Sequence, residues 1–324
     1  MNASAPFSRR HLLISGASTL GAVALGIGFA NRAQGIDEDG RIAVATTVGM
    51  ITDVVRNIGG DLVVAQGLMG PGIDPHTYKP RASDIATLGD ADIIFYGGLH
   101  LEGRMVETFK KIHNGGAIPA IPVAERIPEE LLISHSDTSY AWDPHVWFDV
   151  SLWTIAVEAI AESLSETFPQ HRETFESNLA SYRAELEELD AWIFEQVERL
   201  APEQRVLITA HDAFTYFGAR YGFEVRGVQG VSTASEAGAA DIQNLADFIV
   251  ERRIRAIFVE SSVSPATIEA VQAAVGAQGW GVAIGGSLYA DALGEEGTPE
   301  GTYIGMVRAN VNTIVGALLG ENAE

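Results

Sequence analysis

Short apolar, β-branched runs alternate with amphipathic stretches along the chain from Arg41 onward. This order is typical of parallel sheets covered by helices, so the pattern predicts an α/β fold. In the first part of the chain it predicts strands at 42–47, 61–68, 92–96 and 117–123 and helices at 51–58, 81–90, 102–112 and 150–168. In the last part it predicts strands at 205–209, 223–228, 256–259 and 281–284 and helices at 213–221, 235–253, 265–275 and 301–319.

A long helical stretch separates these two series. Residues 171–200 carry apolar side chains three and four positions apart, which gives one stripe on a helix of roughly 30 residues and about 45 Å. A surface helix or a coiled-coil arm would show the same stripe, but the α/β patterns on both sides favour a connection between two lobes. We therefore expect lobes at 41–168 and 202–324, bridged by 169–201.

The first 35 residues read as a targeting segment. Arg9 and Arg10 precede a moderately apolar run, 12–30, which ends near Ala33, and this order resembles a Tat export signal. The run is also long enough for an uncleaved N-terminal anchor. Cleavage after Ala33 would remove three arginines and no acids, which changes the net charge from −22 to −25.

Composition narrows the functional classes. The net charge of −22 argues against binding to nucleic acid or anionic membranes and suits a cationic ligand. The absence of cysteine excludes disulfides, thiolate sites and a lipid-anchor cysteine. Nitrogen and oxygen atoms must therefore hold any metal ion.

Candidate ligands for such an ion follow predicted strands. The loop Gly70–Pro80 contains too many prolines and glycines for a regular helix, and its centre is the triplet Asp74-Pro75-His76. The chain repeats this triplet at 143–145, which suggests that His76 and His145 are paired ligands. The carboxyl ends of strands are where open α/β sheets bind ligands.

The last part of the chain supplies two further candidates. His211 comes after the predicted strand 205–209, and Asp291 comes after the strand 281–284 and a Gly-Gly-Ser turn. Three imidazoles and one carboxylate suit Zn²⁺ or Mn²⁺, and four protein ligands fill a tetrahedral shell. A catalytic zinc usually keeps one position for water.

The motifs around these residues resemble a known family. They read Gly-Ile-Asp-Pro-His-Thr-Tyr-Lys-Pro, Asp-Pro-His-Val-Trp-Phe-Asp, Thr-Ala-His-Asp-Ala-Phe, Gly-Val-Gln-Gly-Val-Ser-Thr-Ala-Ser-Glu and Ser-Leu-Tyr-Ala-Asp-Ala-Leu-Gly. From about residue 41 to the end, the chain is similar to the zinc/manganese/iron solute-binding proteins of ABC importers, called cluster A-I or TroA-like.

The resemblance implies two α/β lobes bridged by one long helix, with the metal between them. It carries the ligand role onto His76, His145, His211 and Asp291. It further implies a monomeric, non-enzymatic protein of the periplasm that delivers its metal to an ABC permease. Contact with the membrane would occur only through that permease or an uncleaved signal.

The resemblance leaves the metal open between Zn²⁺ and Mn²⁺, with Fe²⁺ behind them. His211 stands where other members place a glutamate, which favours zinc. The His-rich loop of dedicated zinc members is missing, because 128–143 contains only His135, and this weakens the case for zinc.

Other polar residues have simpler interpretations. Asp74 and Asp143 are expected to form turns or to support the histidines, and Asp212 to orient a ligand or cap a helix. Glu236 and Glu260 could rim the cleft, although a solvated position explains them equally well. Ordinary structural roles are expected for His100, His113, His135 and His171.

Two other functions compete with metal transport. A metal-dependent hydrolase would also collect histidines at strand ends, but the sequence has no His-Glu-x-x-His motif and no nucleophile elbow. A surface adhesin of the same family is the second alternative, and no repeats support it.

Overall fold

The structure is a computed structural model that describes residues 40–116, 118–134 and 141–321. Residues 35–324 form one compact unit. The predicted export segment, 1–35, lies outside the described residues. Within the described part, no helix is both long and apolar enough to cross a bilayer.

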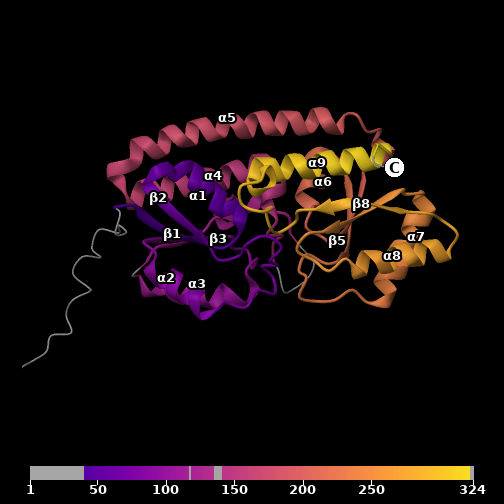
Figure 1. The fold of residues 1–324 in the computed structure, drawn as a ribbon, viewed down its shortest axis with the longest axis horizontal. Helices are drawn as coiled ribbons and strands as arrows, with labels where there is room; N and C mark the ends of the chain where they lie inside the picture. Colours follow the sequence, from indigo (N-terminus) through magenta and orange to yellow (C-terminus); the bar gives the residue numbers. More distant parts are fainter. Residues whose placement is uncertain (1–39, 117, 135–140, 322–324) are drawn as a thin grey trace, which may run out of the picture. The chain divides into compact units, whose positions relative to one another are not determined.

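The first half of the unit is a parallel sheet with the strand order β2-β1-β3-β4. The strands are β1 (Ile42–Thr46), β2 (Val63–Gly67), β3 (Ile93–Tyr96) and β4 (Ala120–Pro122). The helices are α1 (Gly49–Gly59), α2 (Ala82–Asp90), α3 (Val106–Gly115) and α4 (Val150–Thr167). Figure 1 shows α1 and α4 on one side of the sheet and α2 and α3 on the other. The predicted α/β pattern is therefore confirmed for this half.

The second half repeats the parallel arrangement in two short sheets. One pairs β5 (Val206–His211) with β6 (Glu224–Gln229), and the other pairs β7 (Ala256–Glu260) with β8 (Ala283–Leu288). The helices are α6 (Thr215–Tyr221), α7 (Ala239–Arg252), α8 (Ala266–Ala277) and α9 (Tyr303–Leu319). β5 lies against β7, and the last residues of the two strands, His211 and Glu260, are hydrogen-bonded, so the carboxyl ends of both sheets come together.

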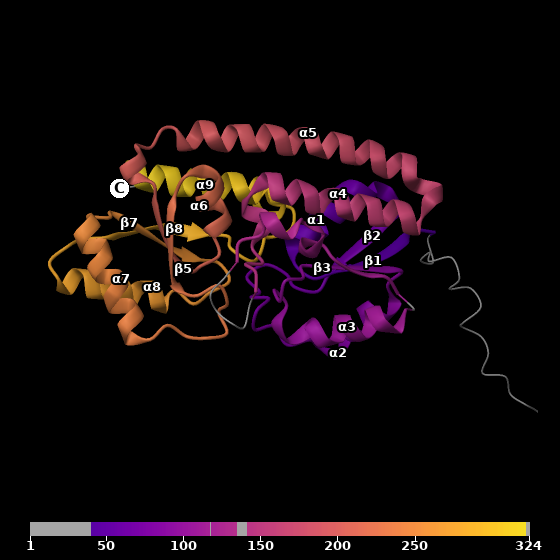
Figure 2. The same cartoon turned by 180° about the vertical axis from the view of Figure 1, so that it is seen from behind.

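The long helix α5 (Arg172–Val197) runs along both halves, as both views show (Figures 1 and 2). Its 26 residues contain no glycine and no proline, so its backbone is continuous. Asn178 donates to Ile58 O in the first half, and Asp190 pairs with Arg220 of α6 at 2.6 Å in the second. The predicted stripe is buried at Phe175, Tyr182, Leu186, Leu189, Ile193 and Val197.

The structure corrects two local predictions. His211 does not follow its strand but is the last residue of β5. The expected Gly-Gly-Ser turn is part of β8, where the register shifts against β7. Helix α9 packs on this strand so closely that a Cβ on Gly285 would lie 2.7 Å from Ala317 Cβ. Close packing, rather than a turn, explains that glycine.

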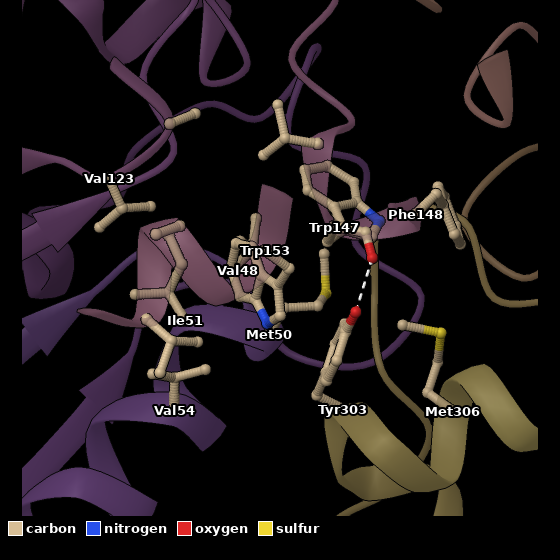
Figure 3. Packing of buried hydrophobic residues seen from close by; sticks show 14 of the residues in the cluster. Val48, Met50, Ile51, Val54, Val123, Trp147, Phe148, Trp153, Tyr303 and Met306 are labelled. Atoms are coloured by element: carbon tan, nitrogen blue, oxygen red, sulfur yellow. Dashed lines mark hydrogen bonds between the residues drawn. The ribbon is translucent and has the colours of Figure 1, made fainter. Parts of the chain in front are cut away.

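A continuous hydrophobic cluster extends from the first half through α5 into β5, α6 and α9, and a smaller cluster lies beneath α7 and α8. Figure 3 shows the large cluster around Trp147, Trp153 and Tyr303. The Tyr303 hydroxyl donates to Trp147 O at 2.7 Å. Trp147 in turn donates its indole N–H to Ala290 O at 3.1 Å. The packing thus ties the segment after His145 to the segment before Asp291.

Candidate metal centre

Four side chains predicted as ligands meet where the two halves face each other. His76 lies in the loop after β2, His145 directly before a 3-10 turn, His211 at the end of β5, and Asp291 after β8. Each offers one ligand atom, and these atoms all lie within 4.8 Å of one another. All four residues are at most 2% exposed. The structure therefore joins two ligands from each half in one buried cluster.

The spacing of the donor atoms suits one small ion. The Nε2 atom of His145 lies 3.2 Å from that of His76 and 3.4 Å from that of His211. Asp291 Oδ1 lies 3.3 Å from Nε2 of His145, and Asp291 Oδ2 lies 3.3 Å from Nε2 of His211 and 3.8 Å from Nε2 of His76. A tetrahedral zinc ion with ligands at about 2.0–2.1 Å separates its donors by about 3.3–3.4 Å. The measured separations of 3.2–3.8 Å are close to these values, so the cluster has the right size to hold one small divalent ion.

A carboxylate fixes the ring of His145. One oxygen of Asp143 accepts the backbone N–H of His145 at 2.9 Å and lies 2.8 Å from its Nδ1. Because a carboxylate only accepts, Nδ1 carries the proton and Nε2 points to the cluster. Tyr216 of α6 holds the same segment through a 3.0 Å bond to Asp143 O. The expected supporting role of Asp143 is thus confirmed.

A second carboxylate, Glu260 at the end of β7, holds His211. It accepts the backbone N–H of His211 at 3.0 Å, and its other oxygen lies 2.5 Å from Nδ1. Glu260 is only 4% exposed, so the interpretation of a solvated charge is wrong. Its position directly after the predicted strand 256–259 was the available sequence signal.

The support of His76 is different. Its backbone N–H donates to Asp74 at 2.8 Å, while its Nδ1 has no hydrogen-bond partner among the described residues. The other oxygen of Asp74 accepts from Thr77 at 2.8 Å and from Thr233 of the second half at 2.6 Å. The turn-forming role expected of Asp74 is confirmed, and the structure adds a contact between the halves.

The carboxylate of Asp291 faces the Nε2 atoms of the three imidazoles. Among the described residues, neither of its oxygens accepts a hydrogen bond of normal geometry, although both are buried. A buried carboxylate needs a compensating positive charge. Protons on the neighbouring imidazoles or a metal ion can supply that charge.

The three histidines of the cluster have different pKa values. Burial lowers the pKa of His76 to about 3, and the raising effect of Asp291 does not compensate. Burial also lowers the pKa of His145, but Asp143 and Asp291 outweigh it and raise the pKa to about 9. Glu260 and Asp291 likewise raise the pKa of His211 against the effect of burial. Burial raises the pKa of Asp291, but His211 and His145 outweigh it, so this pKa lies well below its usual value.

The remaining candidates stay outside the cluster. Asp212 accepts from the Thr215 hydroxyl at 3.0 Å, at the start of α6, and Glu236 is exposed. His171 precedes α5 and contacts Phe175, and His100 lines a separate pocket. His135 lies outside the described residues.

Comparisons with known proteins agree with this geometry. A family model described as zinc-uptake complex component A, periplasmic, matches residues 44–317. The chain is 50% identical over 280 residues to the zinc-binding protein TroA of Treponema pallidum (strain Nichols), covering 86% of this chain and 90% of the relative. It is 45% identical over 291 residues to the manganese-binding lipoprotein MntA of Bacillus subtilis (strain 168), covering 90% and 94%.

The fold comparison points the same way. The solved structure of the periplasmic zinc-binding protein TroA from Treponema pallidum superposes with a TM-score of 0.84 at 49% identity, covering 86% of this chain and 99% of that chain. The matching family model covers residues 44–317, which include most of the fold and all four clustered side chains. The chain belongs to the ZnuA/TroA family of metal-binding solute-binding proteins of ABC importers.

Proposed function

We propose that this protein binds one Zn²⁺ or Mn²⁺ ion outside the cytoplasm through His76, His145, His211 and Asp291 and delivers it to an ABC permease. The observation that carries the proposal is the buried set of four donor atoms within 4.8 Å. The metals named for TroA and MntA support zinc and manganese as the two candidates. In this proposal, residues 41–168 and 202–324 are the two metal-binding lobes, and 169–201 is the bridge between them.

A binding protein accounts for the site better than a hydrolase does. The family consists of solute-binding proteins, which are not enzymes. Four buried protein donors fill a tetrahedral shell, whereas a catalytic zinc keeps a position for water. Three nitrogens and one oxygen suit zinc, while Mn²⁺ prefers a shell richer in oxygen.

Competition between metals tests the proposal. The metal-free protein is titrated with Zn²⁺ in the presence of Mn²⁺, and the reverse, with the affinity followed by a chromophoric chelator. We expect one ion bound per chain. Since Zn²⁺ binds most nitrogen and oxygen sites more tightly than Mn²⁺ does, Mn²⁺ binding as tight as that of Zn²⁺ would identify a site built for manganese. Binding of neither ion would overturn the proposal.

The route of export is a separate part of the proposal. We infer that the Arg9-Arg10 pair directs Tat export to the periplasm and that the mature chain carries no lipid, because the sequence has no cysteine to acylate. MntA is described as a lipoprotein, so the two chains would differ here. Replacing both arginines by lysine should block export, and unchanged export would contradict the Tat assignment.

A further inference from the structure

A strained turn lies beside the metal centre, between β3 and α3. Its residues Gly98, Leu99 and His100 have φ values of 80°, 49° and 67°, all in the left-handed region. That region is unfavourable for side chains other than glycine, so Leu99 and His100 need external support. Among the described residues, only Arg253 is a further non-glycine with positive φ. Strain of this kind persists where the surroundings impose it, often at functional sites.

A buried carboxylate holds this turn in place. Glu102 is 1% exposed, and one of its oxygens accepts from the Thr47 hydroxyl at 2.7 Å and from the Gly97 N–H at 2.5 Å. The other oxygen accepts the Gly98 N–H at 3.2 Å. Thr47 directly follows β1, at the same edge of the sheet from which the loop with His76 leaves β2. Glu102 therefore links the turn to the carboxyl end of β1.

The next residue touches the backbone of a metal-binding residue. A Cβ placed on Gly103 would lie 2.6 Å from the carbonyl oxygen of His76. Gly103 is not among the residues with positive φ, so close approach rather than backbone conformation requires glycine here. Gly103, which follows the turn, thus packs directly against the His76 backbone.

This surface matters because His76 has little other support. The rings of His145 and His211 are each held by a carboxylate at Nδ1, but Nδ1 of His76 has no hydrogen-bond partner among the described residues. No carboxylate therefore orients its ring, and the position of its backbone, together with packing against the other two imidazoles, sets where Nε2 lies. Asp74 fixes the N–H side of that backbone, and Gly103 packs against the C=O side.

We propose that Glu102 and Gly103 are positioning residues of the metal centre, which hold the His76 backbone at the distance that its Nε2 atom needs to reach the ion. The inference deepens the proposed function and rests on it. Neither residue is among the four that offer a ligand atom. A metal site needs its supporting groups nearly as much as its ligands, and loss of such a group typically costs about 10–100-fold in affinity.

The variant Gly103→Ala tests the proposal. We expect about a tenfold or greater loss of Zn²⁺ affinity, because the added methyl group displaces the His76 carbonyl. The absorption spectrum of the Co²⁺-loaded protein should also change, since the geometry of the coordination shell is altered. The control is Gly115→Ala at the end of α3, where a Cβ meets nothing within 4 Å, and wild-type affinity is expected there.

A second variant separates positioning from folding. Glu102→Gln keeps the shape of the side chain but places an amide N–H₂ group against one of the N–H or O–H donors, so the turn loosens. It should lower Zn²⁺ affinity and alter the Co²⁺ spectrum even where thermal unfolding shows a folded protein. If Gly103→Ala does not fold, the decision rests on Glu102→Gln.

Wild-type affinity and an unchanged Co²⁺ spectrum in folded variants would overturn the inference while leaving the proposed function intact. A wild-type protein that binds no metal would instead overturn the proposed function.

Discussion

The two Asp-Pro-His triplets of this chain have the same sequence but different environments. In both, the aspartate accepts the backbone N–H of the histidine, at 2.8 Å for His76 and 2.9 Å for His145. Only Asp143 also holds the ring of its histidine, at 2.8 Å. Asp74 uses its second oxygen for Thr77 and for Thr233 across the interface between the halves.

This difference separates two ways of supporting a ligand. His145 is fixed at its ring and has a pKa of about 9, so it is charged in the metal-free protein at neutral pH. His76 is fixed at its backbone and has a pKa of about 3, so it is neutral. One triplet therefore balances the buried charges, while the other connects the site to the second half of the molecule.

Removal of the histidines should have the largest effect. Loss of a supporting group typically costs about 10–100-fold in metal affinity. His145→Ala and His76→Ala each remove a ligand and should reduce Zn²⁺ affinity by more than that. Only His145→Ala should also lower the melting temperature of the metal-free protein, because it removes the charged partner of Asp143 and one of the two charged imidazoles that face Asp291. Chelator competition and thermal unfolding measure the two effects. Equal destabilisation by both variants would contradict the proposed difference.

The pH dependence sharpens the same comparison. The charged form of His145 stabilises the metal-free protein fully below its ordinary pKa of 6.5, and this contribution is lost as the pH rises through about 9. Metal must displace the Nε2 protons of His145 and His211, so affinity should rise between these pH values by up to about tenfold per pH unit for each proton.

Calorimetry in buffers of different ionisation enthalpy counts the released protons. About two are expected at pH 7 for the wild type, because His145 and His211 are charged and His76 is neutral. Where the His76→Ala variant still binds Zn²⁺, it should release the same number of protons as the wild type. His145→Ala should release one proton fewer. Binding without proton release would show that the imidazoles are neutral before the metal arrives.

Removing the ring-supporting carboxylates should have a smaller effect. Glu260→Gln should lower Zn²⁺ affinity by about 10–100-fold, because each of its two oxygens faces one N–H group of His211 and an amide keeps only one accepting oxygen. Asp143→Asn should cost less, because one oxygen of Asp143 accepts both N–H groups of His145, an amide oxygen can still do so, and only the negative charge beside the ring is lost. Glu236→Gln removes an exposed negative charge from the second half and is the control. If the control variant loses as much Zn²⁺ affinity, the loss of one negative charge anywhere in this half, rather than loss of ring support, explains the result.

The contact between the halves should have the smallest effect. Thr233→Val removes one of three hydrogen bonds to Asp74, and a net loss of about 0.5–1.5 kcal/mol corresponds to roughly two- to tenfold faster Zn²⁺ release. Thr233→Ser keeps the hydroxyl and should release metal at the wild-type rate. Stopped-flow mixing with a chelator measures these rates, and equal rates in Thr233→Val and wild type would exclude a role for this contact.

Much of the fold followed from local patterns. The alternation of apolar runs and amphipathic stretches predicted the strands and helices, since both periodicities are properties of the backbone. The stripe from Phe175 to Val197 predicted α5, and only its length was overestimated. The Gly-Gly-Ser segment was misread because a glycine needed for the packing of α9 looks like a turn glycine in sequence.

The residue types at strand ends also pointed to a metal. Three histidines and an aspartate in loops or at strand ends, in a chain without cysteine, limited the site to nitrogen and oxygen donors. The resemblance to a family then selected these four residues from the eight histidines and many acids.

The sequence by itself thus determined the elements, the chemistry of the donors and the family. Only the tertiary structure decided which carboxylates serve the histidines, because Glu260 is 49 residues from His211 in the chain and meets it only where β5 lies beside β7. The same holds for the contact of Gly103 with His76 and for the different roles of two identical triplets. Burial and neighbouring charges set the pKa of a histidine, and both depend on residues that the fold brings from elsewhere in the chain.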